Sequence, residues 1–166
     1  SIGTAVSQDS LSTPSRIWVS LSYGSAKGNN FSGEMGALIL SLVRDNQVYS
    51  ARILGATRPS ISVTTAGDFN SYSGNLNRIL ETSVLYGLAL NKKFLHFSIS
   101  GGIGFLWGNT YSEPTPTFKS LSFTFDVQIG FSPTPVIGIG LYFFANLNSR
   151  ASFDGAMVCL HLGKLW

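Results

Sequence analysis

A strict alternation of apolar and polar residues constrains this chain more than any other feature. From Leu121 to Phe131 every second residue is apolar, and the residues between are Ser, Thr, Asp, Gln and Gly. A period of two is that of a β-strand, whose side chains point alternately to opposite faces. Related alternation recurs in eight segments, at 16–25, 35–44, 48–57, 76–90, 94–108, 120–131, 136–148 and 156–166. The sequence therefore predicts an all-β chain of eight strands.

The connections between these segments are alternately long and short. The short ones, 45–47, 91–93 and 132–135, contain the Asp, Asn, Ser and Pro residues that tight turns favour. The long ones are polar and are expected at 27–34, 58–75, 109–119 and 149–155. Outer-membrane barrels have short periplasmic turns and long extracellular loops. We therefore expect an eight-stranded antiparallel up-and-down transmembrane β-barrel over 16–166 in a bacterial outer membrane, with both termini periplasmic and the long loops extracellular.

The composition agrees with a membrane location. Hydrophobic residues make up 44% of the 166 residues and charged residues only 11%, which would solvate the surface of a soluble domain poorly. A membrane-spanning helix needs about 20 consecutive apolar residues, and no stretch here is that long. Only helices and closed β-barrels span a lipid bilayer, so a membrane location predicts a closed β-barrel for this chain. A soluble barrel with its apolar face inward is the alternative, because alternation alone does not say which face is wet.

Charge and cysteine content exclude several other classes. The net charge of +3 is scattered without a basic run, so no footprint for nucleic acid exists. The single cysteine, Cys159, rules out an internal disulfide. Residues 1–15 are polar and are expected to form a flexible periplasmic arm. Because the sequence starts without a charged and apolar leader, we interpret it as a mature chain whose export signal has been removed.

Three charged residues fall well inside the predicted strands. Arg52, Glu81 and Asp126 all lie on the face assigned to the lumen, where they avoid the roughly 2–4 kcal/mol that a charge facing mid-membrane lipid costs. A lumen of eight strands is just filled by side chains. We expect a structural polar cluster that fills it, with an ion or proton path as the alternative; its members are Arg52, Glu81, Asp126, Gln128, His96 and His161.

Two short motifs are candidates for a catalytic or a nucleotide-binding site. His96-Phe97-Ser98 resembles the His-x-Ser motif of outer-membrane lipid A deacylases, whose substrate lies in the outer leaflet. The predicted topology places these residues near a periplasmic turn, so we expect no enzyme. The glycines at 101–104 lack the strand–turn–helix context of a phosphate-binding loop. We therefore predict no catalytic residue and no cofactor.

Cys159 and His161 are candidate ligands of a soft metal ion. They share the inward face of the last strand. Two ligands without a third at suitable spacing do not define a metal site. We therefore predict no metal.

The outward face carries aromatic rings and a few small residues. Rings predicted near strand ends suit the headgroup region of a membrane; they are Tyr23, Tyr49, Tyr86, Trp107, Phe131 and Trp166. Ala51, Gly101 and Ala145 interrupt bulky lipid-facing rows. Small residues let another membrane protein approach closely, so these positions are candidate contact points for a partner.

The end of the chain carries a family resemblance. Val158, Leu160, Leu162 and the terminal Trp166 share one face, and this pattern resembles the C-terminal signature by which outer-membrane barrels are recognised for assembly. Together with the eight segments, residues 16–166 resemble a small outer-membrane barrel of the OmpA-transmembrane, OmpX or OmpW type. The resemblance implies outer-membrane lipid, including lipopolysaccharide, and the barrel assembly machinery as partners. The small outward residues add a larger outer-membrane protein complex as an expected partner. The resemblance carries no catalytic residue across.

These observations lead to one expected function and two alternatives. We expect a non-enzymatic barrel with a filled polar lumen that is structural or an accessory subunit of a larger outer-membrane complex. The first alternative is a binding or transport module that uses its loops or a narrow lumen for a small ligand. The second is a lipid A-modifying hydrolase.

Overall fold

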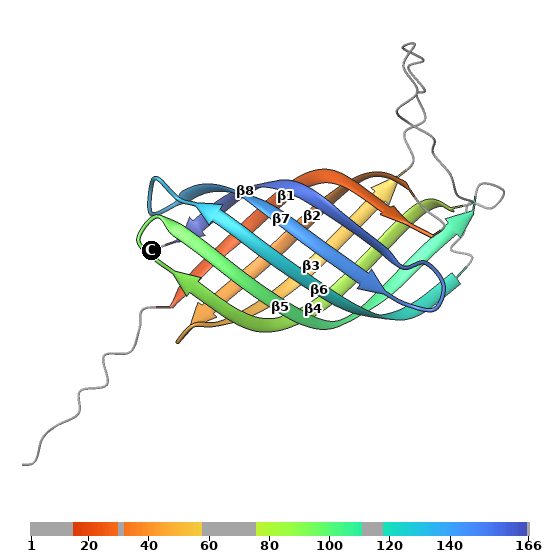
Figure 1. Ribbon diagram of the computed structural model, residues 1–166, viewed down its shortest axis with the longest axis horizontal. Helices are drawn as coiled ribbons and strands as arrows, with labels where there is room; N and C mark the ends of the chain where they lie inside the picture. The colour runs from red at the N-terminus through yellow and green to blue at the C-terminus, as the bar shows by residue number, and fades with distance from the viewer. Residues whose placement is uncertain (1–14, 30–31, 58–75, 111–117, 166) are drawn as a thin grey trace, which may run out of the picture.

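The chain folds into a closed barrel of eight antiparallel strands in chain order (Figure 1). This computed structural model describes residues 15–29, 32–57, 76–110 and 118–165. The strands are β1 (Arg16–Gly28), β2 (Ser32–Arg44), β3 (Gln47–Thr57), β4 (Leu76–Asn91), β5 (Leu95–Thr110), β6 (Phe118–Phe131), β7 (Ile137–Leu147) and β8 (Phe153–Lys164). The predicted all-β, eight-stranded, up-and-down barrel is thereby confirmed. No helix in the described ranges has the length and hydropathy needed to cross a bilayer.

The first strand closes the barrel by pairing on both of its edges. Leu21 lies opposite Leu38 of β2 and opposite Leu160 of β8. The short connection after β2 is a two-residue turn in which Asp45 and Asn46 have φ values of 51° and 65°. Positive φ at both central residues is the geometry that joins twisted antiparallel strands, and Asp and Asn tolerate it well. The short turns lie at the same end of the barrel as both ends of the described chain (Figure 1).

Several strands extend further than the apolar alternation predicts. The expected loop at 27–34 is largely strand, because β1 reaches Gly28 and β2 begins at Ser32. Lys27, for example, still pairs with Ser32 and with Asp154. Backbone pairing continues where the outward side chains have become polar, so the alternation marks only the apolar part of each strand. For the same reason the predicted boundaries of β5, β6 and β8 are wrong by a few residues at the long-loop end.

The predicted inward and outward faces are confirmed. Leu121, Phe123 and Phe125 are about half exposed on the outer surface, whereas Ser122 and Thr124 are buried inside. Large exposed apolar side chains occur on all eight strands. A soluble barrel carries its apolar face inward, whereas an outer apolar band is what a transmembrane barrel presents to lipid.

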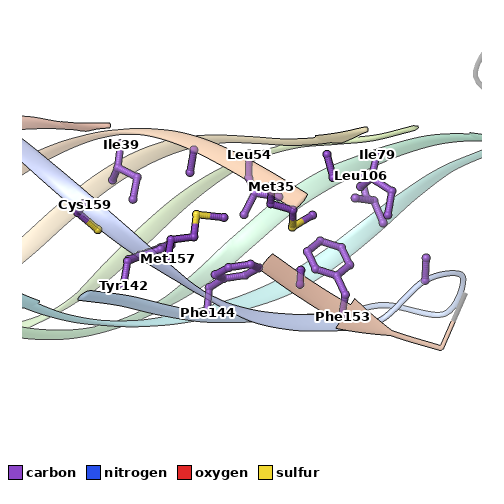
Figure 2. Close-up of a cluster of buried hydrophobic side chains, with 14 residues drawn as sticks. Met35, Ile39, Leu54, Ile79, Leu106, Tyr142, Phe144, Phe153, Met157 and Cys159 are labelled. Atoms are coloured by element: carbon purple, nitrogen blue, oxygen red, sulfur yellow. The ribbon is translucent and has the colours of Figure 1, made fainter. Parts of the chain in front are cut away.

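The interior is not polar along its whole length, so the expectation of a polar lumen needs correction. Towards the long-loop end it is filled by a buried apolar cluster (Figure 2), whose members include Met35, Ile39, Leu54, Ile79, Leu106, Tyr142, Phe144, Phe153, Met157 and Cys159. The sequence pattern does not predict this cluster, because stretches such as 37–40 and 142–145 are apolar on both faces. In such stretches alternation does not indicate which side chains point inward.

Candidate functional site: a charged network across the lumen

Arg52 is the centre of a hydrogen-bonded network inside the barrel. It points inward from β3 and is almost completely buried. Its Nη2 donates to Glu81 Oε1 on β4 over 2.6 Å, and its Nε donates to Ser83 Oγ over 3.1 Å. Both partners are likewise inward residues of the neighbouring strand. The ion pair is therefore held within one wall of the barrel.

The same guanidinium also reaches the opposite wall. Nη1 donates to Tyr142 Oη on β7 over 2.6 Å, and Nη2 also donates to Thr124 Oγ1 on β6. In a closed barrel with strands in chain order, β3 and β7 lie four strands apart in both directions. The planar guanidinium presents five N–H donors in a fixed fork. Arg52 therefore ties together strands from opposite sides of the lumen.

Asp126 completes the network on the far side. Tyr142 Oη donates to Asp126 Oδ2 over 3.1 Å, and Ser100 Oγ on β5 donates to Asp126 Oδ1. Tyr142 thus accepts from Arg52 and donates to Asp126, so one hydroxyl links the cation to its second carboxylate. The Arg52 guanidinium carbon also lies 5.9 Å from the centroid of the Phe144 ring. The network spans five successive strands, β3 to β7.

The side chains of the network fill the middle of the lumen. Every member is buried and hydrogen-bonded, and charged groups that are paired in this way tolerate removal from water. One carboxylate oxygen, Glu81 Oε2, has no hydrogen-bond partner within the described part of the chain. We name the set Arg52, Ser83, Glu81, Ser100, Thr124, Asp126 and Tyr142 the Arg52 network.

The structure brings together Arg52, Glu81 and Asp126 of the predicted cluster but separates the other three residues from them. His161 Nδ1 lies 2.7 Å from Ser20 Oγ, and His96 Nδ1 lies 2.5 Å from Asn91 Oδ1. Gln128 is buried, and its Oε1 has no partner among the described residues. These side chains lie in the lumen between the Arg52 network and the short turns.

Sequence reasoning missed four members of the site, Ser83, Ser100, Thr124 and Tyr142. The alternation already placed Tyr142 and Thr124 on the inward face. The alternation does not give the register between strands, so it does not predict which inward side chains are in contact. Arg52, for instance, lies directly opposite Ser83, whereas Glu81 lies opposite Leu54.

Within the described residues, the other candidate sites do not form a catalytic or metal-binding arrangement. His96 and Ser98 share the inward face of β5, but no hydrogen bond joins their side chains in the described structure. The Cys159 thiol is buried and accepts a hydrogen bond from Ser22 Oγ over 3.2 Å. Within the described ranges no group of three or more His, Cys, Asp or Glu side chains is placed to hold a metal ion.

The outer surface carries a shallow apolar groove on the side of the barrel opposite β7. It has a volume of about 510 Å³ and crosses β2 to β5. Its outward lining residues are Leu38, Leu40, Ala51, Ile53, Thr82, Val84, Ile103 and Phe105. Ala51 and Thr82 are the small side chains among these bulky ones. Gly101 and Ala145 lie elsewhere, on either side of Phe125 in the strand register.

The structure describes all of the predicted assembly residues and interfacial rings except Trp166. Val158, Leu160 and Leu162 all point outward from β8, and Trp166 lies outside the described residues. Tyr49 lies close to the start of β3 at the short-turn end. Tyr86 lies directly opposite Tyr49 in the register, so both rings lie towards the short-turn end. Tyr23 lies in the interior of β1, because this strand continues to Gly28, and the expectation of a ring near the strand end is therefore wrong for Tyr23.

The fold, the outward apolar band and the filled lumen define a class: the chain has the fold of a small eight-stranded outer-membrane β-barrel. Several solved structures have the same fold. The N-terminal β-barrel domain of Pseudomonas aeruginosa OprF superposes with a TM-score of 0.64 at 7% identity, covering 92% of this chain and 98% of that one. Neisserial surface protein A gives 0.63 at 5% identity, covering 93% and 100%.

A third solved structure with this fold is Ail, the attachment invasion locus protein of Yersinia pestis. It gives a TM-score of 0.56 at 10% identity, covering 90% of this chain and 97% of that one. No protein-family model and no curated protein sequence matches this chain. At these identities the likeness concerns the fold.

Proposed function

We propose that this protein is a non-enzymatic integral barrel of a bacterial outer membrane, structural in itself or an accessory subunit of a larger outer-membrane complex. The observation that supports it best is the closed lumen. The Arg52 network crosses the interior from β3 to β7, and the apolar cluster fills the space towards the long loops. A barrel with a closed lumen functions through its outer surface and its loops.

The location and orientation belong to this proposal. Apolar side chains cover the outer surface on all eight strands, and the structural relatives are outer-membrane barrels. The described chain begins and ends at the short-turn end (Figure 1). In outer-membrane barrels that end faces the periplasm. We accordingly assign the short turns to the periplasm and the long connections to the cell exterior, with lipopolysaccharide and other lipid around the band.

The apolar groove around Ala51 and Thr82 supports the accessory-subunit role. Membrane proteins associate by close packing at small residues, since apolar side chains gain little by leaving lipid. A bulky side chain of a partner barrel fits over Ala51, which Leu40 and Val84 flank in the register. The closed lumen presents no comparable surface to a partner protein.

Site-specific photocrosslinking in the native outer membrane tests this role. A photoreactive residue replaces Ala51 on β3, and a matched one replaces Leu141, which is outward-facing on the opposite strand β7. After mild-detergent purification we expect one stoichiometric protein adduct from position 51 and none from position 141. Adducts with lipid alone from both positions, on a barrel that purifies by itself, would contradict the accessory role.

A second function has one specific observation in its favour. The loop-side interior is apolar, which suits a module that takes up small apolar molecules. The test is the fluorescence of an apolar naphthalene dye mixed with the purified barrel, with detergent micelles as the blank. Saturable binding that weakens in Leu106→Asn would favour this function, and binding no greater than to empty micelles would dismiss it.

A further inference from the structure

A small cavity lies in the lumen near the short-turn end. It is lined by Trp18, His96, Ser132, His161 and Leu165 and has a volume of about 10 Å³. Trp18 and His161 are both almost completely buried. The Trp18 ring meets both imidazoles edge-on, with centroid distances of 4.7 Å to His96 and 6.5 Å to His161. Side chains from β1, β5 and β8 therefore converge here.

Three ring nitrogens at this cavity have no hydrogen-bond partner among the described residues: Trp18 Nε1, His96 Nε2 and His161 Nε2. A buried donor or acceptor left unpaired costs about 1–3 kcal/mol, and native proteins pair most such groups with protein or ordered water. Three of them around one cavity indicate a shared partner.

The hydrogen bonds on the far side of each imidazole define what that partner must offer. Asn91 Oδ1 is an acceptor, so Nδ1 of a neutral His96 carries the ring proton and its Nε2 presents a lone pair. Trp18 Nε1 is only a donor. His161 Nδ1 bonds to the Ser20 hydroxyl, which is able to donate or accept, so His161 Nε2 takes either role. The partner must accept from one nitrogen and donate to another.

The backbone around the cavity is built to leave room for the two imidazoles. A Cβ on Gly140 would lie 2.8 Å from His161 Nε2, and a Cβ on Gly130 would lie 3.3 Å from the same atom. Gly130 also lies directly opposite His96 in the register. A larger residue at Gly140 would collide with the Ile129 carbonyl and the His161 ring, and one at Gly130 would crowd the same ring.

We propose that this cavity is a specific binding site for one water molecule, which joins β1, β5 and β8. Its volume matches the roughly 10–15 Å³ that a single water requires, and three polar partners is the usual number for a buried water. The water oxygen accepts from Trp18 Nε1, and one of its hydrogens is donated to His96 Nε2. His161 Nε2 takes the remaining position. The proposal is independent of the accessory-subunit role.

A metal ion satisfies these groups less well. A cation would be ligated by two imidazole nitrogens only and would face the Trp18 N–H, a donor. The Arg16 guanidinium also lies close, since its Nη1 donates to the carbonyl of Leu165, which lines the cavity. Water satisfies donors and acceptors alike and brings no charge beside Arg16.

Nuclear magnetic resonance of the full chain in lipid nanodiscs tests the site. With ¹⁵N-labelled Trp and His, we expect a nuclear Overhauser effect of a long-lived water at the Trp18 indole N–H, and a pyridine-type ¹⁵N shift for His96 Nε2. Trp18→Phe identifies the signal by its loss. If that variant does not fold, Trp107→Phe and Trp166→Phe assign the other two of the three tryptophan signals, which identifies the Trp18 signal by elimination.

Two results would overturn the proposal. One is a folded barrel whose Trp18 indole shows no contact with water. The other is a shift of both histidine Nε2 signals on adding one equivalent of Ag⁺, which would make the cavity a soft-metal site. Unchanged histidine signals with Ag⁺, together with the water contact at Trp18, would establish the water site.

Discussion

Arg52 Nη2 and Glu81 Oε1 lie 2.6 Å apart in the middle of the barrel, and both side chains are fully buried. The two residues sit on neighbouring strands but are not directly opposite each other, because Arg52 pairs with Ser83. The diagonal arrangement leaves the rest of the guanidinium free to reach Ser83 and Tyr142. Burying an ion pair is costly unless further hydrogen bonds satisfy both partners, and those bonds are present for Arg52.

Neutralising one partner of this pair should destabilise the barrel strongly. In Glu81→Gln the Arg52 cation loses its nearest buried counter-charge, and we expect a loss of about 3–5 kcal/mol in the free energy of unfolding. Urea titration in detergent, followed by the heat-dependent mobility shift of folded barrels, measures the loss. Glu34→Gln is the matched control, because that carboxylate is exposed and bonds to Tyr23. Equal stability of the two variants would contradict a structural role for the network.

Replacing both partners should cost less than replacing one. Arg52→Met combined with Glu81→Leu removes the buried ion pair and retains apolar volume, and such exchanges are often neutral or stabilising. Asp126 loses the nearby cation in the double variant but keeps the hydrogen bonds that Tyr142 and Ser100 donate to it. We therefore expect the double variant to unfold at higher urea than Glu81→Gln alone. A double variant that is less stable by the sum of the single losses would show that the pair acts as two independent residues.

The lumen should stay closed when the Arg52 network alone is weakened. Arg52→Ala opens space in the network, but Phe144, Phe153 and Met35 remain packed on its loop side. Planar-bilayer recordings should show no conductance steps for the wild type or for Arg52→Ala. Steps should appear only when Phe144→Ala is added. Stable channels in the wild-type protein would dismiss the closed lumen and favour the transport alternative.

The sequence predicted the architecture well because a barrel repeats one simple rule. In β6 the alternation of Phe123 and Phe125 with Thr124 and Asp126 assigns both faces without ambiguity. The rule fails where both faces are apolar. Ile39 and Phe144 point inward from such stretches, so alternation does not predict the apolar half of the lumen.

The candidate site was only partly predictable for a different reason. Period two places Arg52, Glu81 and Asp126 inside but says nothing about which strand neighbour faces which. The contact of Arg52 with Tyr142 joins residues 90 positions apart in the sequence. Such contacts depend on barrel closure and on the register of five strands, which only the three-dimensional structure supplies.

Close approach of neighbouring strands should make one glycine indispensable and another replaceable. A Cβ on the inward-facing Gly102 would lie 1.9 Å from the carbonyl oxygen of Val84, so backbone would have to move. On Gly36, which faces outward, the nearest atom to a Cβ is 3.7 Å away, an ordinary contact. We expect Gly102→Ala to lose more than about 2 kcal/mol or to fail to fold. Gly36→Ala should stay within about 0.5 kcal/mol of the wild type. Refolding yield into detergent and urea midpoints compare the two, and equal behaviour would contradict the tight packing of β4 against β5.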